Sequence, residues 1–274
     1  MMTALPLSPQ VFTILAMLIE QRAGLHYGPD DRELLAEKVS SRALDAGFDS
    51  LLDYYYFLRY DPKGSASLDA LVDSLLVHET YFFREPQALQ VLVDEVLVPA
   101  VRAGQHPSVW CAACATGEEP LTLAMMLDAK GVLADVSLLA TDLSVRALER
   151  ARVGEYNLRC MRALPKGVEG RWLDVVDGRP RVRPELVAKV EWKQLNLMDT
   201  ANYPAPESFD AVLCRNVLIY FQDDTARRVV DGLTRVLKPG GHLVVGTSES
   251  LMRFGTALHC EERRGSFFYS KAGT

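Results

Sequence analysis

Features typical of several protein classes are scarce or missing in this 274-residue sequence. Cysteine occurs only five times, in an odd and scattered set, which is typical of a reducing cytoplasm and not of a disulfide-linked protein. No apolar run approaches the roughly 18 residues that a membrane span needs. The first ten residues lack the charged start and apolar core of a signal peptide. We therefore expect a cytoplasmic protein without membrane insertion.

Positive charge is also scarce. The chain has 30 Lys and Arg against 36 Asp and Glu, a net charge of −6, whereas a general nucleic-acid binder usually shows a basic excess. Nucleic acid is therefore not an expected partner. Cys111 and Cys114 form a single CxxC, and no second pair follows at zinc spacing, so we expect no metal. Small residues filling a strand end explain this pair better.

The stretch Val109–Leu127, VWCAACATGEEPLTLAMML, organises the rest of the chain. An apolar run leads through small residues into a segment with helical spacing, which predicts a strand, a turn and a helix. An open α/β sheet forms its ligand crevice at such a crossover. Gly117 suits the turn because glycine reaches positive φ easily. Pro120 suits the first helical turn, where no backbone donor is needed.

The two acids at this turn, Glu118 and Glu119, indicate the charge of the ligand. A phosphate-binding turn relies on free backbone N–H groups and avoids carboxylates, so these acids disfavour a pyrophosphate and attract a cation. S-adenosylmethionine, with its ammonium and sulfonium, fits better than NAD or ATP. Alternatively, the acids only complement the helix dipole. This stretch alone leaves both interpretations open.

The first 85 residues read as helices followed by a linker. Apolar periodicity predicts helices over Gln10–Ala23, from Pro29 to Gly47, and over Asp49–Tyr60 and Ser67–Leu76. The second helix carries Arg32, Lys38 and Arg42, for which a solvated face is a simpler explanation than a docking surface. Within the linker VHETYFFREP, Phe82 and Phe83 are expected to pack at the junction between the halves. Arg84 serves a site or pairs with Glu85. A further helix is predicted over Gln87–Ala103.

From Pro107 onward, strands alternate with helices, which predicts a mostly parallel sheet. Arg- and Gly-rich Asn157–Pro184 interrupts this alternation, and Asp177-Gly178 is a hairpin signal, so we expect a small antiparallel insertion. Lys238–Gly241 is predicted to be a tight turn. After Val109–Ala112, the expected strands are Val136–Thr141, Val190–Leu195, Phe209–Cys214, Leu243–Gly246 and Phe267–Ser270.

Polar residues follow the predicted strands at one edge of the sheet. Open α/β sheets bind ligands at the carboxyl ends of their strands. Asp142 is placed to accept the ribose hydroxyls of an adenosine, although a helix cap is the commoner role of such an aspartate. Several such positions along one edge are unlikely to be accidental. They are Gly117 and Glu119, Asp142, Asn196, and Arg215 with Asn216.

Five stretches resemble the CheR family of chemotaxis-receptor glutamate methyltransferases. They are ETYFFRE (79–85), ATGEEP (115–120), ATDLS (140–144), RNVLIYF (215–221) and LKPGG (237–241). The resemblance covers nearly the whole chain. It implies an α/β fold, with a class I, Rossmann-like S-adenosylmethionine methyltransferase domain over 86–274. A small antiparallel β-subdomain is inserted at 157–186, and an all-helical N-terminal domain with its linker occupies 1–85.

The resemblance also implies a reaction and a site. Methyl transfer from S-adenosylmethionine to receptor glutamates would give methyl esters and S-adenosylhomocysteine. The implied partner is the cytoplasmic helical region of chemoreceptors, and a monomer is expected. Arg84 and Tyr220 are assigned to orienting the substrate. The implied cofactor contacts are Thr80, Arg84, Glu119, Asp142, Asn196, Leu197, Arg215 and Asn216, together with Gly117 at the turn.

Two departures from the family pattern affect these expectations. His78 stands where the family shows an asparagine, so no cofactor contact is expected there. The turn DVVDGRPRV is shorter than in members that tether to a receptor's C-terminal pentapeptide, so we expect methylation independent of that pentapeptide. Two other hypotheses are a methyltransferase for another substrate and a non-catalytic S-adenosylmethionine sensor. Intact Arg84 and Tyr220 favour catalysis over sensing.

Overall fold

The computed structural model describes residues 4–273, which divide into two compact units. The first unit contains the chain up to Val77 together with Tyr220–Thr225. The second contains His78–Ile219 and the chain from Ala226 onward.

The first unit is helical, as the sequence predicts. Its helices are α1 (Pro9–Ala23), α2 (Arg32–Asp45), α3 (Leu51–Tyr60) and α4 (Gly64–Leu75), with a short 3-10 turn η1 (Pro29–Asp31) before α2. The hydroxyls of Ser8 and Ser50 accept backbone N–H groups at the starts of α1 and α3. Gly24 ends α1 in the left-handed conformation. The core of the unit includes the fully buried side chains of Leu15, Ile19, Leu35, Val39 and Leu71.

The second unit is built on a seven-stranded sheet with strand order β5-β2-β1-β6-β7-β9-β8. The first five strands in this order are parallel, and β9 and β8 are antiparallel. Between β1 and β6 the strand order reverses, which creates the usual ligand crevice of an open sheet. The strands are β1 (Ser108–Ala112), β2 (Ser137–Asp142), β5 (Val190–Gln194), β6 (Phe209–Cys214), β7 (Leu237–Val245), β8 (His259–Arg263) and β9 (Ser266–Ser270).

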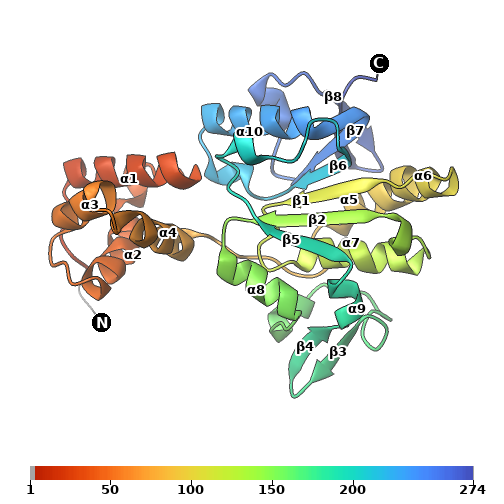
Figure 1. Ribbon diagram of the computed structural model, residues 1–274, viewed down its shortest axis with the longest axis horizontal. Coiled ribbons are helices and arrows are strands. Elements are labelled where there is room, and N and C mark those ends of the chain that lie inside the picture. The colour runs from red at the N-terminus through yellow and green to blue at the C-terminus, as the bar shows by residue number, and fades with distance from the viewer. Residues whose placement is uncertain (1–3, 274) are drawn as a thin grey trace. The chain divides into compact units, whose positions relative to one another are not determined.

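Helices cover both halves of the sheet. Figure 1 shows α7 (Glu118–Ala129) and α8 (Val145–Val153) along the β2–β5 half, and α10 (Asp223–Val236) along the β6–β7 half. Side chains alternate across β1: Val109 and Cys111 join the large hydrophobic cluster that includes α7, whereas the Trp110 ring stacks edge-on against Tyr203. The shorter elements are η3 (Leu133–Asp135), η5 (Thr200–Asn202), η6 (Leu218–Tyr220) and η7 (Leu251–Phe254).

The interruption after α8 is the small antiparallel insertion that the sequence predicts. Strands β3 (Leu173–Val176) and β4 (Arg179–Val182) form a separate two-stranded sheet. The turn between them is Asp177-Gly178, and both residues have positive φ. A 3-10 turn η4 (Leu158–Met161) precedes the hairpin, and α9 (Pro184–Val187) leads from it into β5. The hairpin projects beyond α8 and α9 in Figure 1.

Several local predictions differ from the structure. The helix predicted over Gln87–Ala103 has a π-helical middle, η2 (Leu92–Leu97), between α5 (Pro86–Val91) and α6 (Val98–Arg102). Pro99 follows it, and a proline cannot donate the regular backbone hydrogen bond. A tight turn is predicted at Lys238–Gly241, but in the structure these residues lie inside the continuous strand β7. The pairing register between β7 and β6 shifts at this place, between Phe209 and Ala211. Strand β8 was not predicted because HCEER lacks an apolar alternation.

The linker aromatics pack within the second unit. Phe82 and Phe83 belong to the hydrophobic cluster of the second unit, and Phe82 is completely buried. The Phe82 ring stacks edge-on against Tyr156, with ring centroids 4.9 Å apart. These rings therefore anchor their segment to the α/β unit.

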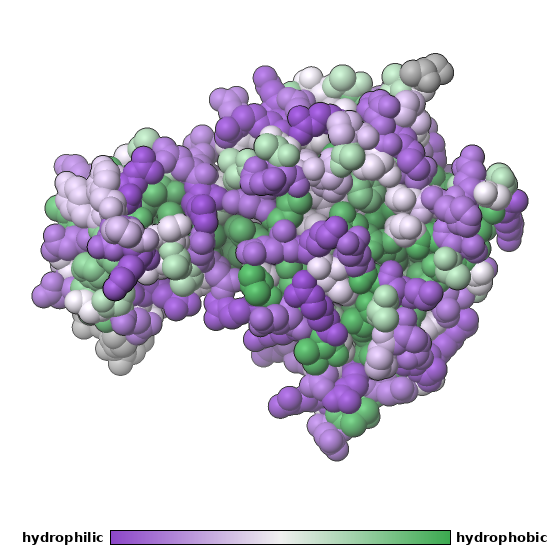
Figure 2. Space-filling view, viewed as in Figure 1, coloured by the Kyte–Doolittle hydropathy of each residue, from purple (hydrophilic) through white to green (hydrophobic). Residues whose placement is uncertain are grey.

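The surfaces of the two units are mixed. Figure 2 shows hydrophilic residues across the visible face of each, with smaller hydrophobic areas between them. Among residues 4–273, no helix combines the length and apolar character that crossing a membrane would require.

Candidate active site

The polar residues predicted to line the sheet lie mostly at one edge of the second unit. Helix α7, which begins directly after Gly117, follows β1, Asp142 ends β2, and Arg215 and Asn216 follow β6. β1 pairs with both β2 and β6, so their carboxyl ends are neighbours. The sheet register thus brings together residues that are about 100 positions apart in the chain.

Arg215 is the centre of this edge. Its side chain is 2% exposed, and Nη1 donates a 2.6 Å hydrogen bond to Glu119 Oε2. Nη2 lies 3.1 Å from Glu85 Oε2 and also donates to the backbone carbonyls of Arg84 and Glu85. The guanidinium therefore ties β6, α7 and the segment before α5 together. Nε is buried without a hydrogen-bond partner among the described residues.

The Arg215 guanidinium and the Glu85 carboxylate are held in their ionised forms. Burial opposes the charge of Arg215, but Glu119 and Glu85 outweigh it and raise the pKa of the guanidinium. Partial burial also opposes ionisation of Glu85. The backbone N–H of Thr247 and the charge of Arg215 outweigh that effect and lower the Glu85 pKa. Glu85, Glu119 and the neighbouring Glu249 set three carboxylates against the guanidinium groups of Arg215 and Arg84, a formal net charge of about −1, which favours a cationic ligand.

Asp142 is buried and fixed by the backbone. Its Oδ2 accepts a 2.8 Å hydrogen bond from the N–H of Ala115, and its Oδ1 accepts one of 2.8 Å from Ser144. Ser144 in turn caps α8 by accepting the N–H of Ala147. Asp142 therefore shapes the turn after β1 as well as its own.

The consecutive acids Glu118 and Glu119 have different environments. Glu119 is partly exposed and pairs with Arg215, as described above. Glu118 is 1% exposed, and its carboxylate accepts hydrogen bonds from the Thr116 hydroxyl (2.7 Å) and the Cys160 thiol (3.1 Å). Burial raises the pKa of Glu118, and the two hydrogen bonds oppose this. The two consecutive acids therefore differ in environment: Glu118 is buried beside Thr116 and Cys160, whereas Glu119 pairs with Arg215.

Left-handed backbone conformations cluster at this edge. Non-glycine residues reach positive φ at Phe83, Glu85, Ala113, Ala115 and Asn216, with φ between 45° and 61°. Such conformations cost free energy and tend to occur where a site needs them. Gly117 also has positive φ (90°), and a Cβ there would lie 2.8 Å from both the Ala151 Cβ and the Trp192 ring. Glycine is therefore required by close packing as well as by the turn.

The segment before α5 is held by backbone hydrogen bonds. Phe82 N–H donates to the carbonyl of Cys160, and Phe83 N–H donates to the Thr122 hydroxyl. Arg84 Nη1 donates to the Glu79 carbonyl at 2.8 Å, and Arg84 Nε lies 3.9 Å from Glu85 Oε1. The alternative pairing of Arg84 with Glu85 is thus present only as a long contact. Thr80 lies in the same segment and is half-buried.

The remaining predicted residues lie in two places. Asn196 follows β5, and its Oδ1 accepts the N–H of Met198 at 3.0 Å. Leu197 is buried, and its carbonyl accepts the Tyr203 hydroxyl. Tyr220 ends η6 and belongs to the first unit, where its carbonyl accepts the N–H of His26. Glu249 was not predicted as a site residue, although it lies in the loop that follows β7, four residues beyond the end of that strand.

Family models account for both units. The model of the CheR methyltransferase all-alpha domain matches residues 10–76, and that of the CheR methyltransferase SAM binding domain matches residues 78–265. The chain belongs to the CheR methyltransferase family. This CheR methyltransferase therefore combines a helical domain with a domain that binds S-adenosylmethionine.

Curated relatives extend the match over nearly the whole chain. A chemotaxis protein methyltransferase of Klebsiella aerogenes is 36% identical over 252 residues, covering 90% of this chain and 85% of that protein. Chemotaxis protein methyltransferase 1 of Pseudomonas aeruginosa is 34% identical over 250 residues, covering 88% and 90%. Chemotaxis protein methyltransferase 2 of Vibrio cholerae is 31% identical over 257 residues, covering 92% and 89%.

The chemistry of the edge fits S-adenosylmethionine. The anionic cluster around Arg215 suits a ligand that carries an ammonium and a sulfonium. Within residues 4–273, the buried Nε of Arg215 is a donor without a hydrogen-bond acceptor, and the buried Asp142 carboxylate lies at the end of β2, where a ribose binds in open α/β sheets. Among residues 4–273, no group of three or more His, Cys, Asp and Glu side chains is arranged to hold a metal ion.

Proposed function

We propose that this CheR methyltransferase converts glutamate side chains of chemoreceptors to methyl esters in the cytoplasm, acting as a monomer. The observation that carries the proposal is the Glu85–Arg215–Glu119 cluster, because it is formed by the motifs FFRE, TGEEP and RNVLIYF, which are specific to this family. The names of the relatives, all chemotaxis protein methyltransferases, support the same substrate class.

Methylation of a glutamate needs little acid–base help from the protein. A glutamate with a pKa of about 4.3 is already ionised at neutral pH, so no general base is required. S-adenosylmethionine supplies an activated methyl group on its sulfonium. The attacking carboxylate and the sulfonium lose their charges together, so a water-poor site and in-line positioning favour the reaction. The protein therefore contributes mainly by binding and orientation.

The proposed roles of individual residues follow from this division. Asp142 accepts the ribose hydroxyls, and Glu119, Arg215 and Asn216 hold the charged end of the cofactor. Thr80, Gly117, Asn196 and Leu197 complete the cofactor contacts. Arg84 guides the substrate carboxylate, and Tyr220 donates a hydrogen bond near the transferred methyl. A firm grip on the carboxylate would weaken it as a nucleophile, so Arg84 and Tyr220 orient the substrate without activating it.

One incubation tests the proposed reaction. The protein is mixed with methyl-labelled S-adenosylmethionine and cytoplasmic helical fragments of candidate receptors, and base-labile label on the receptor is measured. We expect methyl ester on glutamates, and a strong loss of transfer in Arg84→Ala with only a small change in melting temperature. Label that resists base would indicate another acceptor. Cofactor binding without any transfer would favour a sensor.

Receptor engagement is proposed to use the helical unit. The β3–β4 turn is Asp177-Gly178 alone, too short for a glycine-bearing tethering loop. On α2, Lys38 is exposed and Arg42, one turn later, is half-buried, and both suit an acidic receptor helix. Arg32, also exposed, is the first residue of that helix. Exposed ion pairs contribute at most about 1 kcal/mol each, so this contact should be weak and sensitive to salt.

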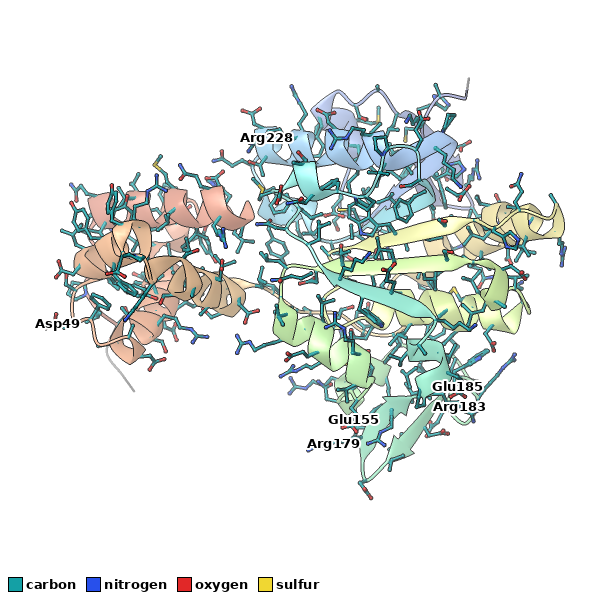
Figure 3. All side chains as sticks on the ribbon, in the orientation of Figure 1. Asp49, Glu155, Arg179, Arg183, Glu185 and Arg228 are labelled. Carbon is teal, nitrogen blue, oxygen red and sulfur yellow. The ribbon has the colours of Figure 1, made fainter. Side chains whose placement is uncertain are left out.

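Two measurements test this mode of engagement. A receptor without its C-terminal tail should be methylated as fast as the intact receptor, and Arg42→Glu should slow methylation of both. The matched control is Arg228→Glu on α10 of the second unit (labelled in Figure 3), which should leave the rate unchanged. Micromolar binding of an isolated tail peptide would contradict the proposal.

A further inference from the structure

Glu249 is a buried carboxylate to which the proposed reaction assigns no role. It lies four residues beyond the end of β7 and is 8% exposed. Its Oε2 accepts backbone N–H groups from Asn216 and Gly246, each at 2.7 Å. Its Oε1 accepts those of Leu218 at 2.7 Å and Ile219 at 3.4 Å. One side chain thus satisfies four backbone donors from the loops after β6 and β7.

Three of these donors lie in the loop after β6, in the segment that begins with Arg215 and Asn216. Asn216 has φ of 61°, a conformation that costs free energy and needs support from its surroundings. The hydrogen bond from its own N–H to Glu249 supplies that support. The next two donors, Leu218 and Ile219, are in the η6 turn that ends at Tyr220. Glu249 therefore holds the backbone on both sides of Val217.

Close packing makes this arrangement hard to replace. A Cβ on Gly246 would lie 2.6 Å from Asn216 Nδ2 and 2.8 Å from Glu249 Oε2. The loops after β6 and β7 thus approach each other as closely as a glycine permits. Thr247 N–H donates to Glu85 Oε2, and Asn216 Nδ2 lies 3.5 Å from Glu85 Oε1. Glu85 also pairs with Arg215, so the Glu249 loops and the guanidinium cluster form one connected network.

We propose that Glu249 is a positioning residue for the cofactor site, which it serves by fixing the backbone of Arg215–Ile219. It acts through Asn216 and Arg215 and does not touch the reacting groups. The inference rests on the proposed cofactor role of those two residues. A carboxylate is required because both of its oxygens accept hydrogen bonds from backbone N–H groups. An amide of the same size would direct an N–H₂ group at backbone N–H donors.

The test compares Glu249→Gln and Glu249→Asp with a destabilised control. Leu97→Ala serves as the control because it removes a fully buried side chain from η2, outside the loops described here. For each protein, calorimetry gives the Kd for S-adenosylmethionine and a thermal scan gives the Tm. Methylation of a receptor fragment gives kcat and the KM for receptor. Calorimetry needs no receptor, so a wild-type protein that binds cofactor without methylating receptor would refute the proposed substrate and leave this test intact.

We expect Glu249→Gln to weaken cofactor binding by about tenfold to a hundredfold, because small displacements of site residues have effects of that size. Its kcat should fall, whereas its KM for receptor should stay within twofold of the wild-type value. Glu249→Asp keeps the charge with a shorter reach and should recover part of the affinity. Leu97→Ala should lower Tm without changing Kd.

The result that overturns the proposal is a Kd of Glu249→Gln within twofold of wild type, whatever its Tm. If Glu249→Gln does not fold, Glu249→Asp carries the test. A Kd raised by more than twofold supports positioning when Leu97→Ala keeps the wild-type Kd, whereas an equal rise in Leu97→Ala assigns the effect to stability and overturns the proposal. A smaller change in Kd assigns Glu249 to stability alone.

Discussion

The carboxyl edge of the main sheet and the inserted β3–β4 hairpin both contain arginine–carboxylate pairs, in opposite environments. At the edge, the Arg215 side chain is 2% exposed and lies between two acids. On the hairpin, the Arg181 side chain is 51% exposed and pairs with Glu155. Figure 3 labels four charged residues of this region, namely Glu155 after α8, Arg179 on β4, Arg183 between β4 and α9, and Glu185 on α9. Removing one partner of a buried pair strongly destabilises a protein because a buried charge is left uncompensated, whereas removing one partner of an exposed pair changes stability little.

The largest expected effect comes from removing the buried guanidinium. Arg215→Met should leave Glu85 and Glu119 without their counter-charge and destabilise the protein by about 3–5 kcal/mol. It should also abolish cofactor binding at concentrations that saturate the wild type. Chemical denaturation and calorimetry measure the two effects. Arg215→Lys, which keeps the charge but not the forked geometry, should fall between the two proteins. Near-native stability of Arg215→Met would refute the comparison.

Asp142 tests the same edge with a smaller effect. Asp142→Ala should weaken S-adenosylmethionine binding by about 1–3 kcal/mol, because ribose hydroxyls lose a charged acceptor. Some stability should also be lost, because the N–H groups of Ala115 and Ser144 lose their acceptor. Calorimetry showing wild-type affinity would remove Asp142 from the cofactor site.

The buried Glu118 should make the stability of the protein depend on pH, which an exposed carboxylate should not. Its pKa is raised in the folded protein, so the protonated form is the one that folding favours. The stability that the folded protein gains from protonated Glu118 is fully present at pH values below the ordinary glutamate pKa of 4.5. It is lost as the pH rises through the raised pKa of Glu118. Glu118→Gln imitates the protonated form, so its Tm relative to wild type should increase with pH over that interval. The matched surface change Glu185→Gln controls for the loss of a carboxylate. A constant Tm difference would refute the assignment.

The smallest effect is expected on the hairpin. Arg181→Ala removes an exposed partner of Glu155 and should change stability by no more than about 1 kcal/mol. Methylation of a receptor fragment without a tail should be unchanged. Thermal scans and the methylation assay check both points. A loss comparable to that of Arg215→Met would show that exposure does not separate the two regions.

The sequence predicted those parts of the fold that depend on strong local patterns. The alternation of apolar strands with amphipathic helices gave the parallel sheet, and Asp177-Gly178 gave the hairpin. Strand β8 was missed because its sequence, HCEER, has no hydrophobic pattern. It is an edge strand that is held by its pairing with β9. The continuous β7 was missed because Pro239 and Gly240 are turn residues, and their register shift depends on the neighbouring β6.

Site residues that directly follow strands could be predicted from the sequence. Residues whose environment depends on tertiary contacts could not. Glu118 and Glu119 are adjacent in sequence, and only the packing of Cys160 against α7 shows that one is buried with its pKa raised. Glu249 carries no distinctive sequence signal beyond its place after β7. Its role depends on four backbone donors that the fold delivers from two loops.

The inserted segment leaves the α/β domain and returns to it at nearly the same point. Val182 N–H donates to the carbonyl of Gly154 at 2.9 Å, and Tyr156 N–H donates to that of Pro180 at 2.8 Å. The segment after α8 is thus hydrogen-bonded to β4, and the hairpin tip beyond these bonds can change in length without disturbing them. The hairpin is therefore an exchangeable module. Grafting a longer tip between Val176 and Arg179 would give the enzyme a new recognition element while leaving its catalytic chemistry intact.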